Sequence, residues 1–341
     1  MNAPKNKNVV CSKVLIEACV EKEVYHLPHE IVRIGGDPDN VIKRGFIKQG
    51  KEVIKQVVIP NTVTAIGAYS FSRCQNLEDI NLPPNLISIG PEAFMYCQNL
   101  KTIILPDSLK KIGHSAFYKC EKITSITIPL CVSEIHDDTF NGCKSLENLK
   151  LHDNIKRIGF SAFYNTKIKN VQLPKNLQSL GVGAFSNTLL DEVEIPKKLS
   201  EIEHRTFLGC KIKQVIIPSN IKSVGTQAFA ECDDLEKVYI YDCTDIADDA
   251  FYCSGKVTIY SGKNSNAEEY AKKHNLPFVE VPSFKMITMA CQKDRPELLK
   301  YLIEKHPVPN WLFKFLIEDI AYQNNAQQCI RFLAKWKSEN L

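Results

Sequence analysis

The stretch IILPDSLKKIGHSAFYKC, residues 103–120, decides the fold, because the chain repeats it with variations. Its Phe117 belongs to a column that returns every 23 residues up to Phe163 and every 22 residues after it. The column consists of Phe71, Phe94, Phe117, Phe140, Phe163, Phe185, Phe207, Phe229 and Phe251. A period of this length is typical of an array of similar units, each of which packs against its neighbours.

Each repeat contains two aliphatic positions that flank a variable one, as Ile103 and Leu105 flank Ile104. This alternation predicts one short strand per repeat with one buried face. A proline follows in most repeats and ends the strand, because it cannot donate a hydrogen bond to the sheet. We call the variable positions the outward row: Val58, Asn81, Ile104, Thr127, Lys150, Gln172, Glu194, Ile216 and Tyr239.

Two further columns carry small residues. Glycine follows a third aliphatic position at Gly67, Gly90, Gly113, Gly159, Gly181 and Gly225. We expect this glycine to mark a tight bend that needs special backbone angles.

Cysteine follows the phenylalanine at Cys74, Cys97, Cys120, Cys143, Cys210 and Cys232. One cysteine per turn forms a straight ladder rather than a tetrahedral metal site. Disulfides between neighbouring turns remain an alternative, because such turns lie within disulfide reach. Buried free thiols in a reducing compartment explain the column better.

The pattern I-x-I-P-x-x-L-x-x-I-G-x-x-A-F-x-x-C-x-x-L resembles the BspA-like leucine-rich repeat of bacteria and protists, over residues 51–281. The resemblance implies a repeat solenoid, namely a leucine-rich-repeat parallel β solenoid of about nine turns. The segment 260–278 is similar to the usual end of such arrays. A short helix and a last strand near 278–281 are therefore expected to cap the open edge. Many members of this family are cell-surface proteins.

The two ends differ from the repeats. Residues 1–50 contain Val24–Pro28 and Ile31–Gly35, which look like a degenerate capping repeat. Residues 282–341 change to helical spacing and contain both tryptophans, Trp311 and Trp336. They resemble two degenerate ankyrin-type helix pairs. This helical tail is expected either to dock on the last turns or to present its aromatic face to a partner.

Composition and motifs argue against several functions. The net charge of +4 is too small and dispersed to favour nucleic acid. No apolar run reaches the roughly 18 residues of a membrane span, and the first residues lack the apolar core of a signal peptide. No phosphate-binding glycine loop, Gly-x-Ser-x-Gly motif or Cys-x-x-Cys pair occurs. His136-Asp137-Asp138 is expected to be a substituted bend rather than an acid–base pair. We therefore predict no catalytic residue, cofactor or metal site.

The sequence predicts a cytoplasmic, monomeric, non-catalytic scaffold that binds a protein or peptide along the outward row. The candidate contacts are Ile104, Thr127, Lys150, Gln172, Glu194, Ile216, Tyr239 and Tyr241. Aromatic enrichment places a possible hot spot near Tyr239, Tyr241 and Tyr252. One alternative is a cell-surface adhesin or a secreted effector that is exported without an N-terminal signal. Another is an enzyme or ligand site in the helical tail.

Overall fold

The computed structural model describes residues 10–11, 24–27, 33–35, 53–240, 244–281, 289–305 and 325–340. The chain forms a parallel β solenoid with a few short helices, as the sequence predicts, and it has about ten turns where about nine were predicted. It divides into two compact units. The first comprises Met1–Ile216, Asn220–Glu236 and Ala247–Lys256, and the second Ile217–Ser219, Lys237–Ile246 and Val257–Leu341.

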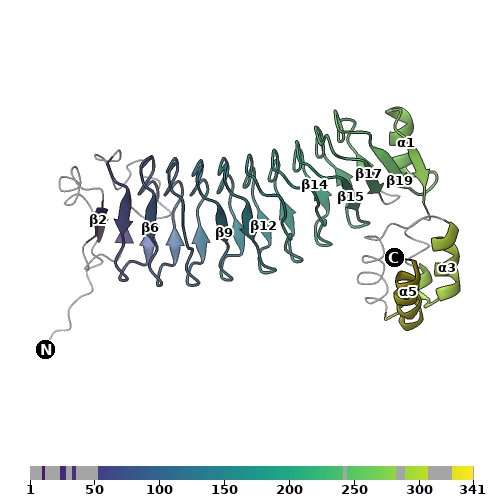
Figure 1. The fold of residues 1–341 in the computed structure, drawn as a ribbon, viewed down its shortest axis with the longest axis horizontal. Helices are drawn as coiled ribbons and strands as arrows, with labels where there is room; N and C mark the ends of the chain where they lie inside the picture. The colour runs from purple at the N-terminus through teal and green to yellow at the C-terminus, as the bar shows by residue number, and fades with distance from the viewer. Residues whose placement is uncertain are drawn as a thin grey trace. The chain divides into compact units, whose positions relative to one another are not determined.

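Most turns of the first unit contribute two β segments, where the sequence predicts one (Figure 1). In the first unit the outward row lies on β4 (Gln56–Val58), β6 (Asp79–Asn81), β9 (Ser125–Thr127), β11 (Asn148–Lys150) and β15 (Gln214–Ile217), and β2 (Val24–His26) pairs with β4. The second set of strands has two residues each: β1 (Val10–Cys11), β3 (Arg33–Ile34), β5 (Ala65–Ile66), β7 (Ser88–Ile89), β8 (Lys111–Ile112), β10 (Glu134–Ile135), β12 (Arg157–Ile158), β13 (Ser179–Leu180), β14 (Glu201–Ile202) and β16 (Ser223–Val224).

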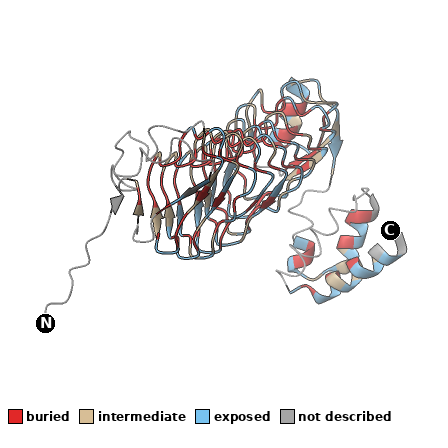
Figure 2. Ribbon diagram, turned by 60° about the vertical axis from the view of Figure 1, so that its left-hand side comes forward, coloured by how far each residue is buried: buried red, intermediate tan, exposed pale blue. Residues whose placement is uncertain are grey.

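All pairing in these sets is parallel, with equivalent residues of successive turns in register. Val57 lies opposite Ile80, and Ile126 lies opposite Leu149. The alternation buries the central residue and exposes those beside it, so that β6, β9 and β11 share one burial pattern (Figure 2). The outward-row strand is not formed in every turn, however. Among the described residues, 102–104 contribute one bridge, and 170–172 and 192–194 contribute none.

The phenylalanine column forms the core of the first unit. The ring centroids of successive phenylalanines lie as close as 5.2 Å, in the Phe71–Phe94 pair, and as far apart as 6.2 Å, in the Phe185–Phe207 pair. Neighbouring rings are nearly parallel. Eight of the nine side chains are fully buried. The backbone beside them also bonds from turn to turn, since the N–H of Phe94 donates to the carbonyl of Ala116 at 2.8 Å. Each turn is thus stabilised mainly by the two turns that flank it.

The cysteine column is buried, as the sequence predicts, and makes its own ladder of hydrogen bonds. The Sγ of Cys97 donates to the carbonyl of Phe71, one turn earlier, at 3.1 Å. Equivalent bonds of 3.1–3.2 Å join Cys120 to Phe94, Cys143 to Phe117, Cys210 to Phe185 and Cys232 to Phe207. Burial raises the pKa of the Cys120, Cys143 and Cys232 thiols, and it raises that of Cys210 to about 11. The column therefore joins neighbouring turns through free thiols.

We expect native thiol labelling at pH 8 to separate two kinds of cysteine. Cys131 and Cys253 are exposed and should react quickly, whereas the buried column should react only when its turns open. Peptide mapping by mass spectrometry after a short pulse of iodoacetamide would measure each site. Labelling in denaturant gives the reference for complete reaction. Equal native rates at Cys120 and Cys131 would contradict the buried ladder.

The glycine column has a different cause from the one predicted. None of its members adopts a positive φ, so special backbone angles do not explain it. Close approach between turns does, because a Cβ on Gly90 would lie 2.6 Å from the backbone nitrogen of Ala68. At Gly225 it would lie 2.8 Å from the nitrogen of His204. Glycine is therefore required here so that the backbones of adjacent turns can lie close together.

The second unit contains a parallel sheet and helices. Its elements are β17 (Lys237–Ile240), β18 (Asp245–Ile246), β19 (Thr258–Ser261), α1 (Asn266–Lys273), β20 (Phe278–Glu280), α3 (Pro296–Lys305) and α5 (Gln327–Asn340). β17, β19 and β20 pair in that order. Helix α1 begins after Ser265, whose side chain accepts the N–H of Glu268. The short helix and last strand expected near 278–281 are thus present.

The helical tail has a small core of its own. Buried Leu299 and Leu302 of α3 belong to the same apolar cluster as Cys329 and Leu333 of α5. The Asp294 carboxylate accepts the N–H groups of Gln328 and Cys329 at 3.0 and 2.9 Å, which caps α5 and lowers the pKa of Asp294. None of the helices in the described ranges is long and apolar enough to cross a bilayer.

Candidate functional site

The outward row faces solvent through most of the first unit. Five of the predicted contacts are exposed there, namely Ile104, Thr127, Lys150, Gln172 and Glu194. A sixth, Ile216, is half-buried. Ile104 stands out because 77% of this apolar residue is accessible. Other members of the row take part in turn-to-turn bonding. The Asn81 amide, for example, donates to the carbonyl of Ile59 and accepts its N–H at 2.9 and 2.8 Å.

The prediction of Tyr239 as an exposed contact is wrong. In the second unit its side chain is buried, with 3% exposed. β17 and β19 place it opposite Tyr260, and the two rings stack with centroids 4.5 Å apart. Burial and the neighbouring Tyr260 raise the pKa of Tyr239 well above its usual value. Tyr241 lies outside the described residues, while Tyr252 is exposed in the first unit.

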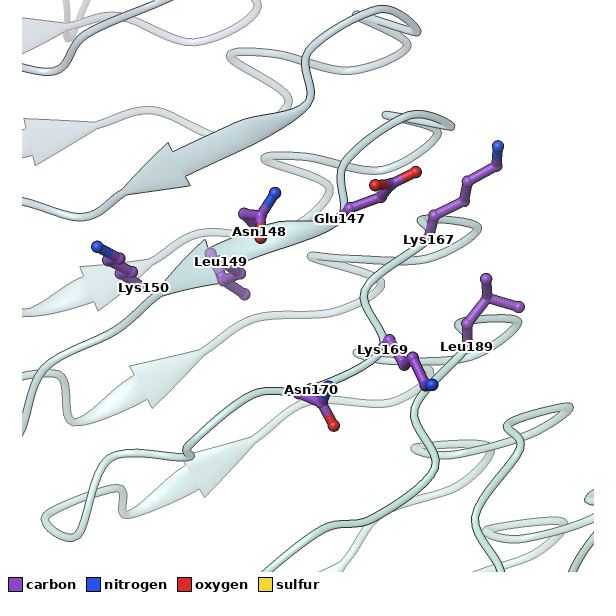
Figure 3. A pocket seen from close by; sticks show the side chains of 8 residues that line it. All are labelled: Glu147, Asn148, Leu149, Lys150, Lys167, Lys169, Asn170 and Leu189. Atoms are coloured by element: carbon purple, nitrogen blue, oxygen red, sulfur yellow. The ribbon is translucent and has the colours of Figure 1, made fainter.

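The first unit has a hollow of about 420 Å³ beside β11 (Figure 3). We call it the lysine hollow, and it is lined by Glu147, Asn148, Leu149, Lys150, Lys167, Lys169, Asn170 and Leu189. Three successive turns contribute these side chains. Lys150, predicted from the outward row, is one of them. The lysines at 167 and 169 and the leucine at 189 come from the loops before the strand positions and were not predicted.

A change in repeat length coincides with this hollow. Two residues separate buried Cys143 from buried Leu146, but only Lys167 separates Thr166 from Ile168. The next turn is shortened in the same way, with Leu189 in the single position. β11 pairs with β9, and in the described chain no strand pairs with its other edge. We attribute the hollow to this shortened loop, and the shift from 23 to 22 residues was the signal in the sequence that could have located it.

The charges around the lysine hollow are only partly paired. Some lysines elsewhere pair with an acid one turn away, as in Lys101–Glu78 at 2.6 Å and Lys144–Glu121 at 3.1 Å. In the hollow, Lys169 lies 3.5 Å from Asp191. Within the described part of the chain, Lys150 and Lys167 form no ion pair or side-chain hydrogen bond. The hollow thus presents two unpaired cations to solvent.

The segment His136–Asp138 has a structural role. The Oδ1 atom of Asp137 accepts Arg157 at 3.0 Å and the N–H of Phe160 at 2.9 Å, so it joins two turns. Burial lowers the pKa of His136 and raises that of Asp138, whose carboxylate accepts the Asn141 amide at 2.6 Å. Over the ranges that the structure describes, no three His, Cys, Asp or Glu side chains are arranged to hold a metal ion.

Comparison with known proteins agrees with this architecture. No curated protein matches the chain. A leucine-rich cell surface protein of Faecalibacterium prausnitzii is similar in fold, with 23% identity and a TM-score of 0.50 over 76% of this chain and 87% of that one. A leucine-rich repeat protein of Bacteroides ovatus is 26% identical, with a TM-score of 0.50 over 70% of this chain and 63% of that one.

The family comparison covers the repeats themselves. The model of the BspA type leucine-rich repeat region, with six copies, matches residues 46–167 and 156–274. These ranges include the full phenylalanine column and the lysine hollow. The chain therefore belongs to the BspA type leucine-rich repeat family.

Proposed function

We propose that this chain is a non-catalytic, monomeric scaffold that binds a protein or an extended peptide along the outward row of its first unit. The observation that supports this most directly is the exposure of Ile104, Thr127, Lys150, Gln172 and Glu194 in successive turns. Their chemistry changes from apolar to basic to acidic while the buried columns stay constant. Such a graded surface suits a long ligand that contacts several turns at once.

Two pairs of substitutions test this proposal. Peptides are first selected from a random display library against the intact chain. Thr127→Glu with Gln172→Glu, on the outward row, should weaken the selected peptides about tenfold or more through bulk and charge. Ser133→Glu with Ser200→Glu adds the same charge at exposed positions outside the row and should change affinity less than about twofold. Failure to select any peptide, or equal losses in both variants, would contradict the proposal.

We propose a cytoplasmic location, with a cell-surface or secreted protein as the alternative. The buried cysteine column supports the first, because reduced thiols persist in a reducing compartment. Thiols would be counted in unfolded, unreduced protein from its native source. Thirteen reactive thiols would support the cytoplasm, and several missing ones would support export.

We further propose that residues 1–50 form a capping repeat, 51–281 the solenoid and 282–341 an ankyrin-like tail. The apolar cluster shared by α3 and α5 supports the tail as a packed helical element. Trp336 is half-buried against that cluster, whereas Trp311 lies outside the described residues.

A further inference from the structure

We propose that the lysine hollow binds an acidic, extended peptide segment of a protein partner. This inference rests on the proposed function and adds the chemistry of the ligand. It places the strongest contact beside β11, at the change in repeat length, rather than at the tyrosines near the end of the array. The shape of the hollow, its charges and its neutral lining residues all favour such a ligand.

The shape suits a segment rather than a compact ion. Figure 3 shows Lys150 and Lys167 at opposite ends of the hollow, with Asn148, Asn170 and Lys169 between them. The lining comes from three successive turns, so a ligand that touches all of it must extend across turns. A chain with carboxylates some residues apart could reach both end lysines.

The charges favour an anion. Three lysines and one glutamate line the hollow, and Asp191 lies just outside it, 3.5 Å from Lys169. Lys101 and Lys144 would have to break pairs of 2.6 and 3.1 Å to bind a carboxylate. In the described chain Lys150 and Lys167 have no such pair to break. A ligand carboxylate therefore gains its full interaction with these two amines.

The neutral lining residues favour a peptide over a nucleic acid. The side-chain amides of Asn148 and Asn170 carry both donors and acceptors, which match the N–H and C=O groups of an extended backbone. Leu189 is 44% exposed and offers an apolar contact at the same rim. Glu147 would repel a continuous row of phosphates, whereas a peptide can place a neutral residue beside it.

The experiment uses the intact chain and a random twelve-residue peptide display library. We expect the selected pool to be enriched in Asp and Glu, and its binding to weaken with added salt. Lys150→Gln with Lys167→Gln and Lys169→Gln should weaken the pool about tenfold or more, at roughly 0.5 kcal/mol or more per lysine. Lys110→Gln with Lys156→Gln and Lys222→Gln removes the same charge from exposed positions outside the hollow and should change binding less than about twofold.

Several outcomes would overturn the inference. A pool without acidic enrichment, or one unaffected by the hollow variant, would place the ligand elsewhere. Equal losses in both triple variants would show a general charge effect. Oligothymidylate of equal length is the test for a nucleic acid. If it bound more tightly than the peptide pool, and if its binding also depended on the three lysines, the ligand would be a nucleic acid instead. A pool whose binding depends on Thr127 and Gln172 but not on the lysines would contradict this inference and leave the scaffold proposal standing. Failure to select any pool would contradict both the inference and the scaffold proposal.

Discussion

Replacing Phe140 with alanine should lower the free energy of unfolding of the first unit by about 3–5 kcal/mol. The ring is fully buried and stacks between Phe117 and Phe163, with centroids 5.4 and 5.6 Å away. Since no side chain can move along the column to fill the gap, the cavity should persist. Native-state hydrogen exchange would measure the loss and show it largest in the two flanking turns.

Phe251→Ala is the matched control for that substitution. Its ring stacks on Phe229 at 5.7 Å, and 6% of the residue is exposed, whereas Phe140 is fully buried. We expect a smaller loss than for Phe140→Ala, because a partly exposed ring leaves a less enclosed cavity. If the two substitutions cost the same, or if Phe140→Ala cost less than about 1 kcal/mol, the stacked column would not be the main source of stability.

Gly181→Ala should destabilise the first unit by about 1–3 kcal/mol, although it adds only one methyl group. That Cβ would lie 2.5 Å from the carbonyl carbon of Gly159 and 2.6 Å from the nitrogen of Phe160. Both are backbone atoms, and the N–H of Gly181 is itself bonded to the carbonyl of Ile158 at 2.8 Å. The turns can relieve the collision only by moving apart, which weakens the bonds between them. Thermal unfolding followed by circular dichroism would measure the shift.

A second glycine, two residues away, separates steric from conformational causes. Gly183 has a φ of +63°, and its Cβ would find the nearest atom, Ser161 Oγ, at 3.3 Å. Asparagine tolerates this left-handed conformation, and the preceding turns place Asp138 and Ser161 there with positive φ. We therefore expect Gly183→Asn to change stability by less than about 1 kcal/mol. A cost equal to that of Gly181→Ala would mean that backbone approach is not what the glycine column serves.

The sequence predicted the features that depend on period and polarity. Hydrophobic alternation around Ile104 and Thr127 identified the buried and exposed positions, because side chains on a strand point alternately to opposite faces. The phenylalanine and cysteine columns were identified as buried for a similar reason. The repeating pattern specifies each turn almost independently of the rest of the chain.

Features that depend on distances between turns were harder to predict. The role of Gly181 requires knowing how close the neighbouring backbone lies, and an alignment of repeats does not contain that distance. Tyr239 was expected to be exposed by its place in the row, but a tyrosine at the paired position, Tyr260, stacks on it. The lysine hollow was not predicted, because the change from 23 to 22 residues does not by itself show which surface loop is shortened. Its effect on the surface appears only when Lys167 and Leu189 are placed beside β11.

The shortened loop at Lys167 has a consequence for how a ligand can be positioned. An array of identical turns has translational symmetry, so a bound chain could shift by one turn and meet the same contacts with the same energy. Such a ligand would occupy many degenerate registers, and no part of it would be held at a fixed place. The change from two residues between Cys143 and Leu146 to one residue between Thr166 and Ile168 breaks this symmetry at the boundary between the 23-residue and the 22-residue turns. A repetitive protein can thereby fix the register of a partner without changing the buried residues that hold its turns together.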